Sequence, residues 1–446
     1  MLPYLYFIDP VQRAPTLGCM LMCLSASLVG VIVFLRKQSL LGETLSHASY
    51  PGVIMGVMVA GSFGFESFWE KTPSLFILGG AFLTALAGLW AIHFLEKKAK
   101  IRNDSALCFV LSAFFGIGLT LASEVQFSHT ALYRQAQSYL YGQAATMNDT
   151  HVFIYGLLAL FVLTIILLFY KEIQALTFDR QYARSLGIPA LKIEGLIFLL
   201  IVLAVVIGIR SVGVVLMSAM FIAPAVAARQ FTHKLHYMLF LAALFGLASG
   251  FLGNYVSVES SRYLSLSTGK RLVLPTGPTI VIIASLFCLI SLLAAPERGL
   301  IIRIIRIALF RTQCMLENIL KSMWRRGSQQ ELHISEIKQM HGINTIYLQY
   351  LLAKLVRQGY LVDLGGGGYS LSQLGRAKGE KIIRMHRLWE VYLADYLGIG
   401  AERVHKSAEE MEHIMTPELE RELTLLLNDP KEDPHHQPIP PLNEIL

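Results

Sequence analysis

The chain has 446 residues, of which 54% are hydrophobic and 15% are charged, and its mean hydropathy is +0.53. Charged residues make up roughly a quarter of an ordinary soluble globular protein, so this composition excludes that class. Residues 1–297 contain 19 Lys and Arg with 13 Asp and Glu, whereas residues 298–446, half as long, contain 19 and 18. The sequence therefore predicts a membrane domain over 1–297 joined to a soluble domain.

The charge of the soluble part is divided between two segments. Residues 298–387 contain 15 basic and 5 acidic residues, and residues 388–446 contain 4 and 13. This pattern predicts contact with a polyanion in the first segment and acidic ligand groups in the second. The five cysteines are odd in number and form no CxxC pattern, which makes a disulfide framework or a cysteine zinc site a poor interpretation.

Nine apolar runs have about the 20 residues that a membrane-spanning helix needs. They lie near 16–35, 45–64, 73–95, 105–123, 151–170, 192–209, 212–228, 237–256 and 276–295. The basic residues between them, among them Arg36 and Lys37 and the cluster at 97–102, fall on one side if the N-terminus is outside. Residues 296 onward are then expected to be cytoplasmic.

An ionisable pair lies in the second apolar run. Glu43 and His47 are four residues apart, so a helix presents both on one face at or inside the membrane boundary. A carboxylate with an imidazole suits a divalent first-row transition metal. A hydrogen-bonding arrangement at the start of a helix is an equally good interpretation of the spacing alone.

Residues 178–189 form a short amphipathic segment on the expected inner face, ended by Gly187 and Pro189. Such a segment can dock onto a cytoplasmic partner or be a solvated loop. The sequence contains no GxxxxGK[ST] motif, so ATP hydrolysis is expected on another chain and the protein itself is not predicted to be an enzyme.

Several ordered motifs in residues 15–296 resemble the manganese, zinc and iron permeases of ABC importers. These motifs are LGETLSHA at 41–48 with Pro51 and Gly52, DSA at 104–106, the segment 178–189, VGVVL at 212–216, Pro224 and PTG at 275–277. The resemblance implies a homo- or heterodimeric permease, a separate ATPase that docks near Ala183 to Gly187, and an extracytoplasmic metal-binding protein. It also implies that Glu43 and His47 belong to the metal pathway, although the family usually has Asp where this chain has Glu43.

The soluble part begins with a basic amphipathic linker helix over 298–312. Helices are then expected near 313–326, from Ser335 to Gly342, and from the N-cap Asn344 to Gly359. Strands around a turn at 365–368 predict a wing. This order predicts a winged helix-turn-helix domain over 313–375 that contacts DNA through Thr345, Tyr347, Gln349 and Tyr350; a three-helix packing module is the alternative.

The acidic segment 376–446 contains a second group of metal-ligand types. His405, Glu409, Glu412 and His413 share one face of a predicted helix, and His386 and Glu390 form an i, i+4 pair on a preceding one. Nitrogen and oxygen ligands favour Mn(II) or Fe(II) over structural zinc. A solvated acidic helix with ordinary salt bridges is the alternative interpretation.

Residues 313–446 resemble the iron- and manganese-dependent repressors of the diphtheria-toxin-repressor type. The resemblance rests on the predicted helix-turn-helix and wing and on LSQLG at 371–375, RMHRL at 384–388, VH at 404–405, EHIM at 412–415 and PIP at 438–440. It implies a dimer that binds operator DNA when a divalent metal, Fe(II), Mn(II) or Zn(II), is bound. The implied primary ligands are Met315, Glu409, Glu412 and His413, and the ancillary ligands are His386, Glu390 and His405.

As a whole the sequence resembles the chlamydial fusions of a metal permease with a repressor. It predicts an all-α polytopic domain, a linker, a winged helix-turn-helix domain and a helical metal-binding and dimerisation domain over 376–446. The expected function is metal import across a bacterial inner membrane, with a cytoplasmic metal-dependent repressor. Alternatives are a membrane-anchored metal sensor that no longer transports, and a C-terminal domain that gates transport.

Overall fold

The computed structural model divides the chain into two compact units, Met1–Ile302 and Arg303–Leu446. The composition predicts this boundary at residue 297. Each unit contains hydrophobic core clusters of its own. The structure describes residues 3–62, 73–128, 137, 139–140, 142, 144–214, 216–269, 273–296, 299–327, 330–400, 405, 408–409, 411–414 and 416–441.

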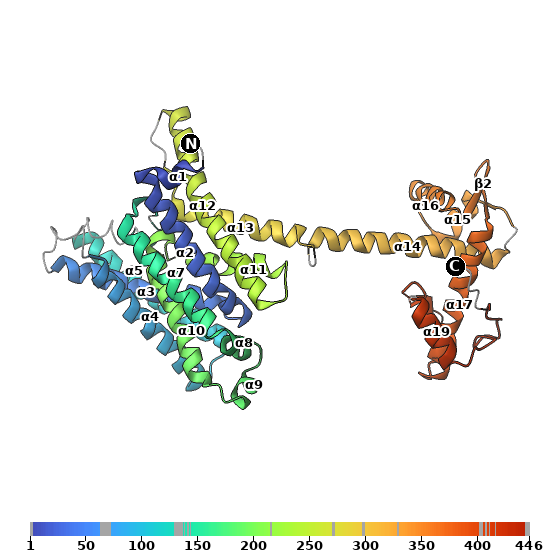
Figure 1. The fold of residues 1–446 in the computed structure, drawn as a ribbon, viewed down its shortest axis with the longest axis horizontal. Helices are drawn as coiled ribbons and strands as arrows, with labels where there is room; N and C mark the ends of the chain where they lie inside the picture. Colours follow the sequence, from blue (N-terminus) through green and yellow to red (C-terminus); the bar gives the residue numbers. More distant parts are fainter. Residues whose placement is uncertain are drawn as a thin grey trace. The chain divides into compact units, whose positions relative to one another are not determined.

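The first unit is a helix bundle in the part of the chain that the structure describes (Figure 1). Seven of its described helices are long and apolar enough to cross a membrane: α2, α4, α5, α7, α10, α12 and α13. The helices of the unit are α1 (Leu5–Ile8), α2 (Pro10–Leu35), α3 (Ser39–Ser62), α4 (Pro73–Lys97), α5 (Asn103–Ser128), the short 3-10 turn η2 (Ala144–Thr146), α7 (Asp149–Leu168), α8 (Tyr170–Phe178), α9 (Arg180–Ser185), α10 (Ala190–Val212), α11 (Met217–Arg229), α12 (Leu235–Thr268) and α13 (Thr276–Ala294).

Each of the nine predicted apolar runs overlaps a described helix, but nine spans are not confirmed. The run at 212–228 corresponds to α11, which has 13 residues, fewer than the roughly 20 that cross the hydrocarbon core. The run at 45–64 corresponds to α3, which is long enough at 24 residues but carries the polar stretch Thr44 to Tyr50 in its first half. Its polar content keeps α3 outside the seven candidates.

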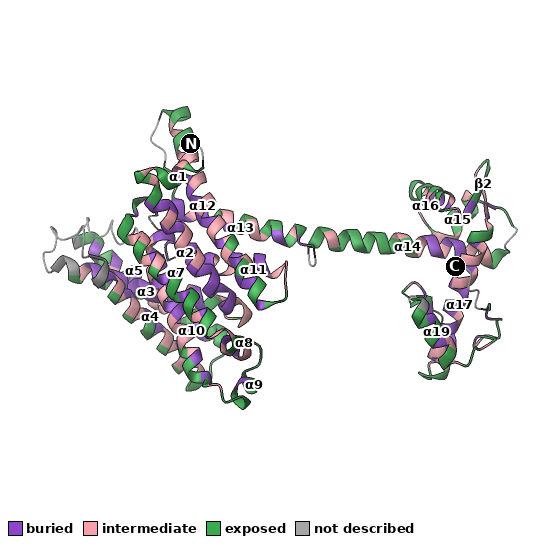
Figure 2. Ribbon diagram, in the orientation of Figure 1, coloured by how far each residue is buried: buried purple, intermediate pink, exposed green. Residues whose placement is uncertain are grey.

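Helix α2 lies at the centre of the bundle and is buried along most of its length (Figure 2). Two glycines of α12 allow close approach: a Cβ atom at Gly246 would lie 2.7 Å from the backbone oxygen of Cys23, and one at Gly250 would lie 2.7 Å from that of Cys19. Lipid tails are as apolar as leucine, so membrane helices associate through such close packing of small residues.

Helix α3 packs closely against α4 and α5. At the crossing with α4, a Cβ atom at Gly52 would lie 2.0 Å from the backbone oxygen of Gly80, and one at Gly80 would lie 2.3 Å from that of Gly52. Only a pair of glycines allows this backbone separation. The crossing therefore fixes α3, which carries Glu43 and His47.

The second unit contains helices and a small antiparallel sheet with strand order β1-β3-β2. Buried leucines, among them Leu348, Leu351 and Leu352 of α16, fill the core beneath the sheet and the first helices. The elements are α14 (Leu300–Arg326), β1 (Leu332–His333), α15 (Ile334–His341), α16 (Thr345–Arg357), β2 (Leu361–Gly365), β3 (Gly368–Leu371), α17 (Gln373–Asp395) and α19 (Pro417–Leu426).

The predicted helix caps and the predicted glycine turn of this unit are present in the structure. The side chain of Asn344 accepts a hydrogen bond from the backbone N–H of Ile346 at 3.1 Å and caps α16. Gly342 ends α15 in the left-handed conformation, with φ of 64°. The two strands β2 and β3 meet at the predicted glycine turn.

One expectation differs from the structure. The linker over 298–312 and the helix near 313–326 were expected as separate elements, but Leu300–Arg326 is one continuous helix, α14. Residues 300–326 contain neither proline nor glycine, so nothing in the backbone ends the helix between the two segments.

Candidate metal centres

His47 lies inside the first unit with little contact with solvent. It is 7% exposed, and its ring packs edge-on against Phe115 of α5 with 4.5 Å between ring centroids. Its Nδ1 atom is buried and has no hydrogen-bond partner among the residues that the structure describes. Pro51 lies four residues later and has no N–H, so it cannot donate the helical hydrogen bond to the carbonyl of His47. One residue thus offers two groups that can bind a cation.

Glu43 lies one turn before His47 and is half-buried. Its backbone oxygen accepts a hydrogen bond from the Ser46 hydroxyl at 3.0 Å. Because α3 begins at Ser39, both Glu43 and His47 lie within the helix and neither caps it. A helix-cap role is therefore excluded for both side chains, and the spacing places them on one face of α3.

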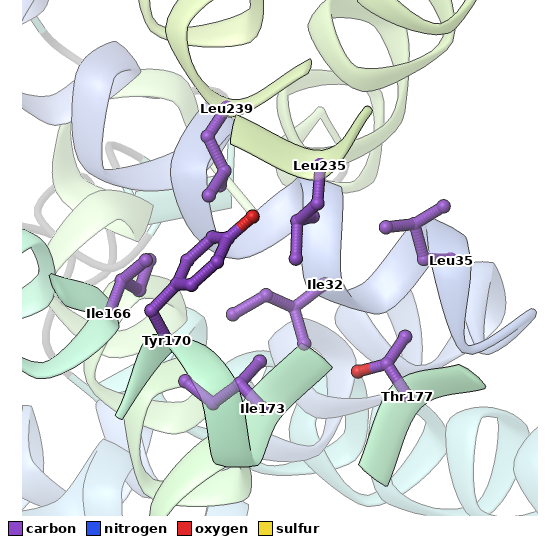
Figure 3. Close-up of a pocket in the computed structure, with 8 residues that line it drawn as sticks. All are labelled: Ile32, Leu35, Ile166, Tyr170, Ile173, Thr177, Leu235 and Leu239. Atoms are coloured by element: carbon purple, nitrogen blue, oxygen red, sulfur yellow. The ribbon is translucent and has the colours of Figure 1, made fainter. Parts of the chain in front are cut away.

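A hollow in the bundle has an apolar lining (Figure 3). It lies between α2, α7, α8 and α12, and its lining is aliphatic apart from the side chains of Tyr170 and Thr177. Figure 3 shows the Tyr170 ring reaching across the hollow toward Leu239. First-row divalent ions bind imidazole, carboxylate or thiolate groups, so this hollow does not fit a metal ion.

The predicted docking segment forms the short helix α9, capped by the side chain of Asp179. Ala183 is fully buried, and Gly187 follows the helix with φ of +75°. Three large apolar side chains of the segment are exposed: Phe178 at 59%, and Tyr182 and Leu186 at 57% each. Ala183, at 0% exposed, packs against the bundle and offers no side-chain surface.

Charged groups connect α9 to the bundle. Glu194 of α10 lies 2.7 Å from Nη2 of Arg180 in α9 and 3.4 Å from Nη2 of Arg36 after α2. The side chains of Glu194 and Arg36 are each 12% exposed. The carboxylate of Glu194 thus joins the candidate docking helix to two helices of the core.

In the second unit the structure brings together His386 and Glu390 of α17 with His405. One ligand atom from each residue lies within 4.8 Å of the other two. Nε2 of His386 is 3.2 Å from Oε1 of Glu390 and 3.0 Å from Nδ1 of His405, which is itself 2.8 Å from Oε1 of Glu390. His386 and Glu390 are buried, and His405 is half-exposed.

These distances fit a divalent ion. Ligand atoms about 2.1 Å from one metal, at the angles of octahedral or tetrahedral coordination, lie roughly 3.0–3.4 Å apart. The contacts of Nε2 of His386, at 3.0 and 3.2 Å, fall in this range, and the contact between His405 and Glu390, at 2.8 Å, is slightly shorter. Burial raises the pKa of Glu390, but hydrogen bonds from His386 and His405 outweigh it and lower the pKa to about 2, so the carboxylate is charged and able to bind a cation.

The expected primary ligands do not assemble in the same way. Glu412 and His413 are buried, whereas Glu409 is exposed and lies 3.6 Å from Nε2 of His405. Nδ1 of His386 contacts Oε2 of Glu412 at 2.5 Å, which places Glu412 beside the group of three. Met315 packs at the edge of the core cluster of α14 and α16.

Two residues that the sequence did not single out complete this region. Lys321 of α14 lies 2.9 and 2.7 Å from the two carboxylate oxygens of Glu412. Glu317, one turn earlier on α14, contacts Nδ1 of His413 at 2.7 Å. Burial raises the pKa of Glu412, but the hydrogen bond from His386 and the charge of Lys321 outweigh it and keep the pKa below its usual value.

The candidate DNA-contact residues lie on α16. Tyr347, Gln349 and Tyr350 are exposed, Thr345 is half-buried, and the rings of Tyr347 and Tyr350 stack with 6.3 Å between centroids. The opposite face of α16 carries the buried leucines of the core. Tyr347 also contacts the hydroxyl of Thr312 in α14 at 3.3 Å.

The fold and these sites define a multi-pass membrane transport protein that carries a metal-regulator domain. Residues 8–295 match the model of the family described as ABC 3 transport family, and residues 372–441 match the iron dependent repressor, metal binding and dimerisation domain. The chain belongs to the ABC 3 transport family.

Known proteins resemble one or both parts. A probable metal transport system membrane protein of Chlamydia trachomatis is 36% identical over 97% of both chains. The manganese transport system membrane protein MntC of Bacillus subtilis is 31% identical over 84% of this chain and 82% of its own, and the zinc transport system membrane protein TroC of Treponema pallidum is 35% identical over 67% and 94%.

A solved structure resembles the membrane unit. The structure of PsaBC from Streptococcus pneumoniae in complex with Fab covers 66% of this chain and 97% of its own, with 26% identity and a TM-score of 0.54. The protein is therefore a metal-transport permease with a repressor-like C-terminal domain.

Proposed function

We propose that this chain is the permease subunit of an importer for a divalent transition metal in a bacterial inner membrane, and that its C-terminal domain is a cytoplasmic metal-dependent repressor. The observation that carries the transport half is the buried Nδ1 atom of His47, which has no hydrogen-bond partner among the described residues. Glu43 and His47 would bind the ion in transit, and the carbonyl of His47 adds a further oxygen.

The proposal includes three protein partners. A separate ATPase would dock on Tyr182 and Leu186 around Ala183 and Gly187, and the contacts of Glu194 would pass its movement to α2 and α10. A second permease chain and an extracytoplasmic metal-binding protein complete the importer. The names of the relatives include both manganese and zinc, and nitrogen and oxygen ligands of this kind also suit Fe(II).

The regulatory half rests on the group of His386, Glu390 and His405. A divalent ion held by these three residues, with Glu409 as a further ligand, would join the 405–414 segment to α17. Glu412 and Lys321 connect that segment to α14, and Thr312 of α14 contacts Tyr347 of α16. We propose that α14, α15, α16 and the β2-β3 hairpin form a winged helix-turn-helix that binds operator DNA as a dimer.

Uptake measurements test the transport half. We expect His47→Ala to reduce manganese or zinc accumulation by the assembled importer at least about tenfold, because a lost ligand is worth roughly 1.4 kcal/mol or more. His93→Ala is the matched control, since His93 is a histidine of α4 whose Nδ1 contacts the backbone oxygen of Leu89 in its own helix. Normal uptake by the His47 variant contradicts this function and leaves the membrane-anchored sensor.

Titration with the DNA upstream of its own gene tests the regulatory half. We expect His386→Ala in the full chain to remove the metal dependence of DNA binding at fixed salt. His436→Ala is the control, because His436 belongs to the same unit and is almost fully exposed. Metal-dependent binding by the His386 variant would contradict the assignment.

A further inference from the structure

Lys321 lies in a position that is unusual for a lysine. Its side chain is 6% exposed and that of Glu412 is 0% exposed. An ammonium group that is removed from water is costly unless a charged partner compensates it. Both carboxylate oxygens of Glu412 supply that compensation, at 2.9 and 2.7 Å.

This ion pair changes what Glu412 can bind. Both oxygens of this carboxylate contact the ammonium of Lys321, and one of them contacts Nδ1 of His386. The ammonium also lies 3.2 Å from that Nδ1, so the Nε2 atom of His386 is the ring nitrogen that remains for a metal ion. A protonated lysine has no lone pair and cannot be a metal ligand itself. A divalent ion could bind Glu412 only after the ammonium group had moved away. The ion would then have to enter a region in which both side chains are buried.

The neighbouring candidate ligand is engaged by the same helix. His413 contacts Glu317 at 2.7 Å, and Glu317 also accepts a hydrogen bond from Gln313 at 2.8 Å and lies 3.5 Å from Lys378. Glu317 and Lys321 are one turn apart on α14, so one face of this helix holds both Glu412 and His413. By contrast, Nε2 of His386 lies 3.2 Å from Glu390 and 3.0 Å from His405, which is the spacing of ligands around a single ion, and no lysine lies among these three atoms in the part of the chain that the structure describes.

We propose that the ammonium of Lys321 serves as a built-in cation at Glu412, so that the regulatory unit takes one divalent ion, at His386, Glu390 and His405, rather than two. The inference rests on the proposed metal-sensing function and deepens it. Lys321 holds the 412–413 segment on α14 without a metal ion. A metal ion would therefore alter the structure of the unit only by binding at His386, Glu390 and His405.

Counting bound ions tests this inference. The full-length chain with His47→Ala, which removes the pathway ligand, would be titrated in lipid nanodiscs with Mn(II) while the electron paramagnetic resonance signal of free Mn(II) is recorded. We expect one tightly bound ion per chain, which His386→Ala removes. Two tightly bound ions would overturn the inference and preserve the sensing function, whereas no bound ion would overturn the sensing function itself.

Variants of the ion pair supply the second measurement, each in the His47→Ala background. Lys321→Met should raise the count from one ion to two, Lys321→Arg should keep it at one because the charge is retained, and Lys378→Met is the matched control that should also keep it at one. Glu412→Gln should leave the single ion bound. If Glu412→Gln loses that ion, Glu412 is a ligand and the inference is wrong; this outcome can be read even if Lys321→Met does not fold.

Discussion

His47 and His386 are both buried histidines four residues from a glutamate, and their surroundings are opposite. His47 is 7% exposed and packs against Phe115, with a buried Nδ1 that has no partner in the part of the chain that the structure describes. His386 is 1% exposed, and both of its ring nitrogens contact other ligand-type groups, Glu412 at Nδ1 and Glu390 and His405 at Nε2.

The difference indicates how a histidine and a glutamate four residues apart could serve either transport or sensing of an ion. Donors that are already assembled bind an ion tightly, because little order has to be created on binding. A pathway must release its ion in every cycle, so a few isolated donors are sufficient there. In the proposed function, a sensor must keep its ion long enough to change DNA binding, and three assembled donors would allow that.

The largest effect is expected from a substitution at the crossing of α3 and α4, because this crossing positions Glu43 and His47. Gly80→Ala places a Cβ atom 2.3 Å from the backbone oxygen of Gly52, so α3 and α4 must separate. We expect the purified chain to lose about 3 kcal/mol of stability, the upper end for overpacking, and to lose metal uptake as α3 moves. Thermal unfolding in detergent measures the first effect.

The adjacent glycine is a matched control for that substitution. Gly79 lies on the same helix, and no atom of the described residues lies within 4 Å of the position that its Cβ atom would take. We expect Gly79→Ala to stay within about 1 kcal/mol of the unmodified chain. Equal stability of the two variants would show that the α3–α4 crossing does not set the geometry around His47.

An intermediate effect is expected on α16. Gln349 and Gln358 are exposed glutamines on the same helix, one on the candidate DNA-contact face and one at the C-cap. Gln349→Ala should weaken metal-dependent operator binding by about 1 kcal/mol, several-fold in Kd, through a lost hydrogen bond. Gln358→Ala should leave the Kd unchanged in the same fluorescence-anisotropy titration. Similar losses for both would remove α16 as the specific contact element.

The last expected effect is confined to acid pH. The pKa of Glu390 is lowered to about 2 in the fold, against an ordinary value of 4.5. A carboxyl group with a lowered folded pKa stabilises the fold above its unfolded pKa, and this contribution is lost as the pH falls from about 4.5 toward 2. Hydrogen exchange in α17 of the metal-free chain, corrected for intrinsic rates, should therefore accelerate over that range.

Two variants sharpen the acid experiment. Glu390→Gln should flatten the dependence, since the titrating group is gone. Glu422→Gln changes an exposed carboxyl group of α19 and should leave the profile as it is. An unchanged profile in the Glu390 variant would mean that the contacts of His386 and His405 do not stabilise the charged carboxylate.

The sequence predicts those parts of the sites that depend on local spacing. Glu43 with His47 and His386 with Glu390 are i, i+4 pairs, which a helix brings together whatever the rest of the chain does. Asn344 at the start of α16 and Gly342 at the end of α15 could also be predicted, because helix caps depend on the local sequence. The resemblance to known families adds His405, which lies 19 residues from His386 in the sequence.

Long-range contacts could not be predicted in this way. Lys321 and Glu412 are 91 residues apart, and Glu317 and His413 are 96 apart, so no local pattern indicates either pair. From the sequence alone, Lys321 is not distinguishable from the other basic residues of an amphipathic helix. The separate linker over 298–312 was inferred from charge, yet helix continuity depends on the absence of breaking residues, and residues 300–326 form one helix.

The central claim is that His47 belongs to a site that releases its ion and His386 to a site that retains it. Mn(II) binding to the full-length chain in nanodiscs, compared among the unmodified chain, His47→Ala and His386→Ala, tests it most directly. We predict two classes of sites in the unmodified chain, of which His386→Ala removes the tight class and His47→Ala the weak class. Tight binding that survives His386→Ala and disappears with His47→Ala would contradict the account.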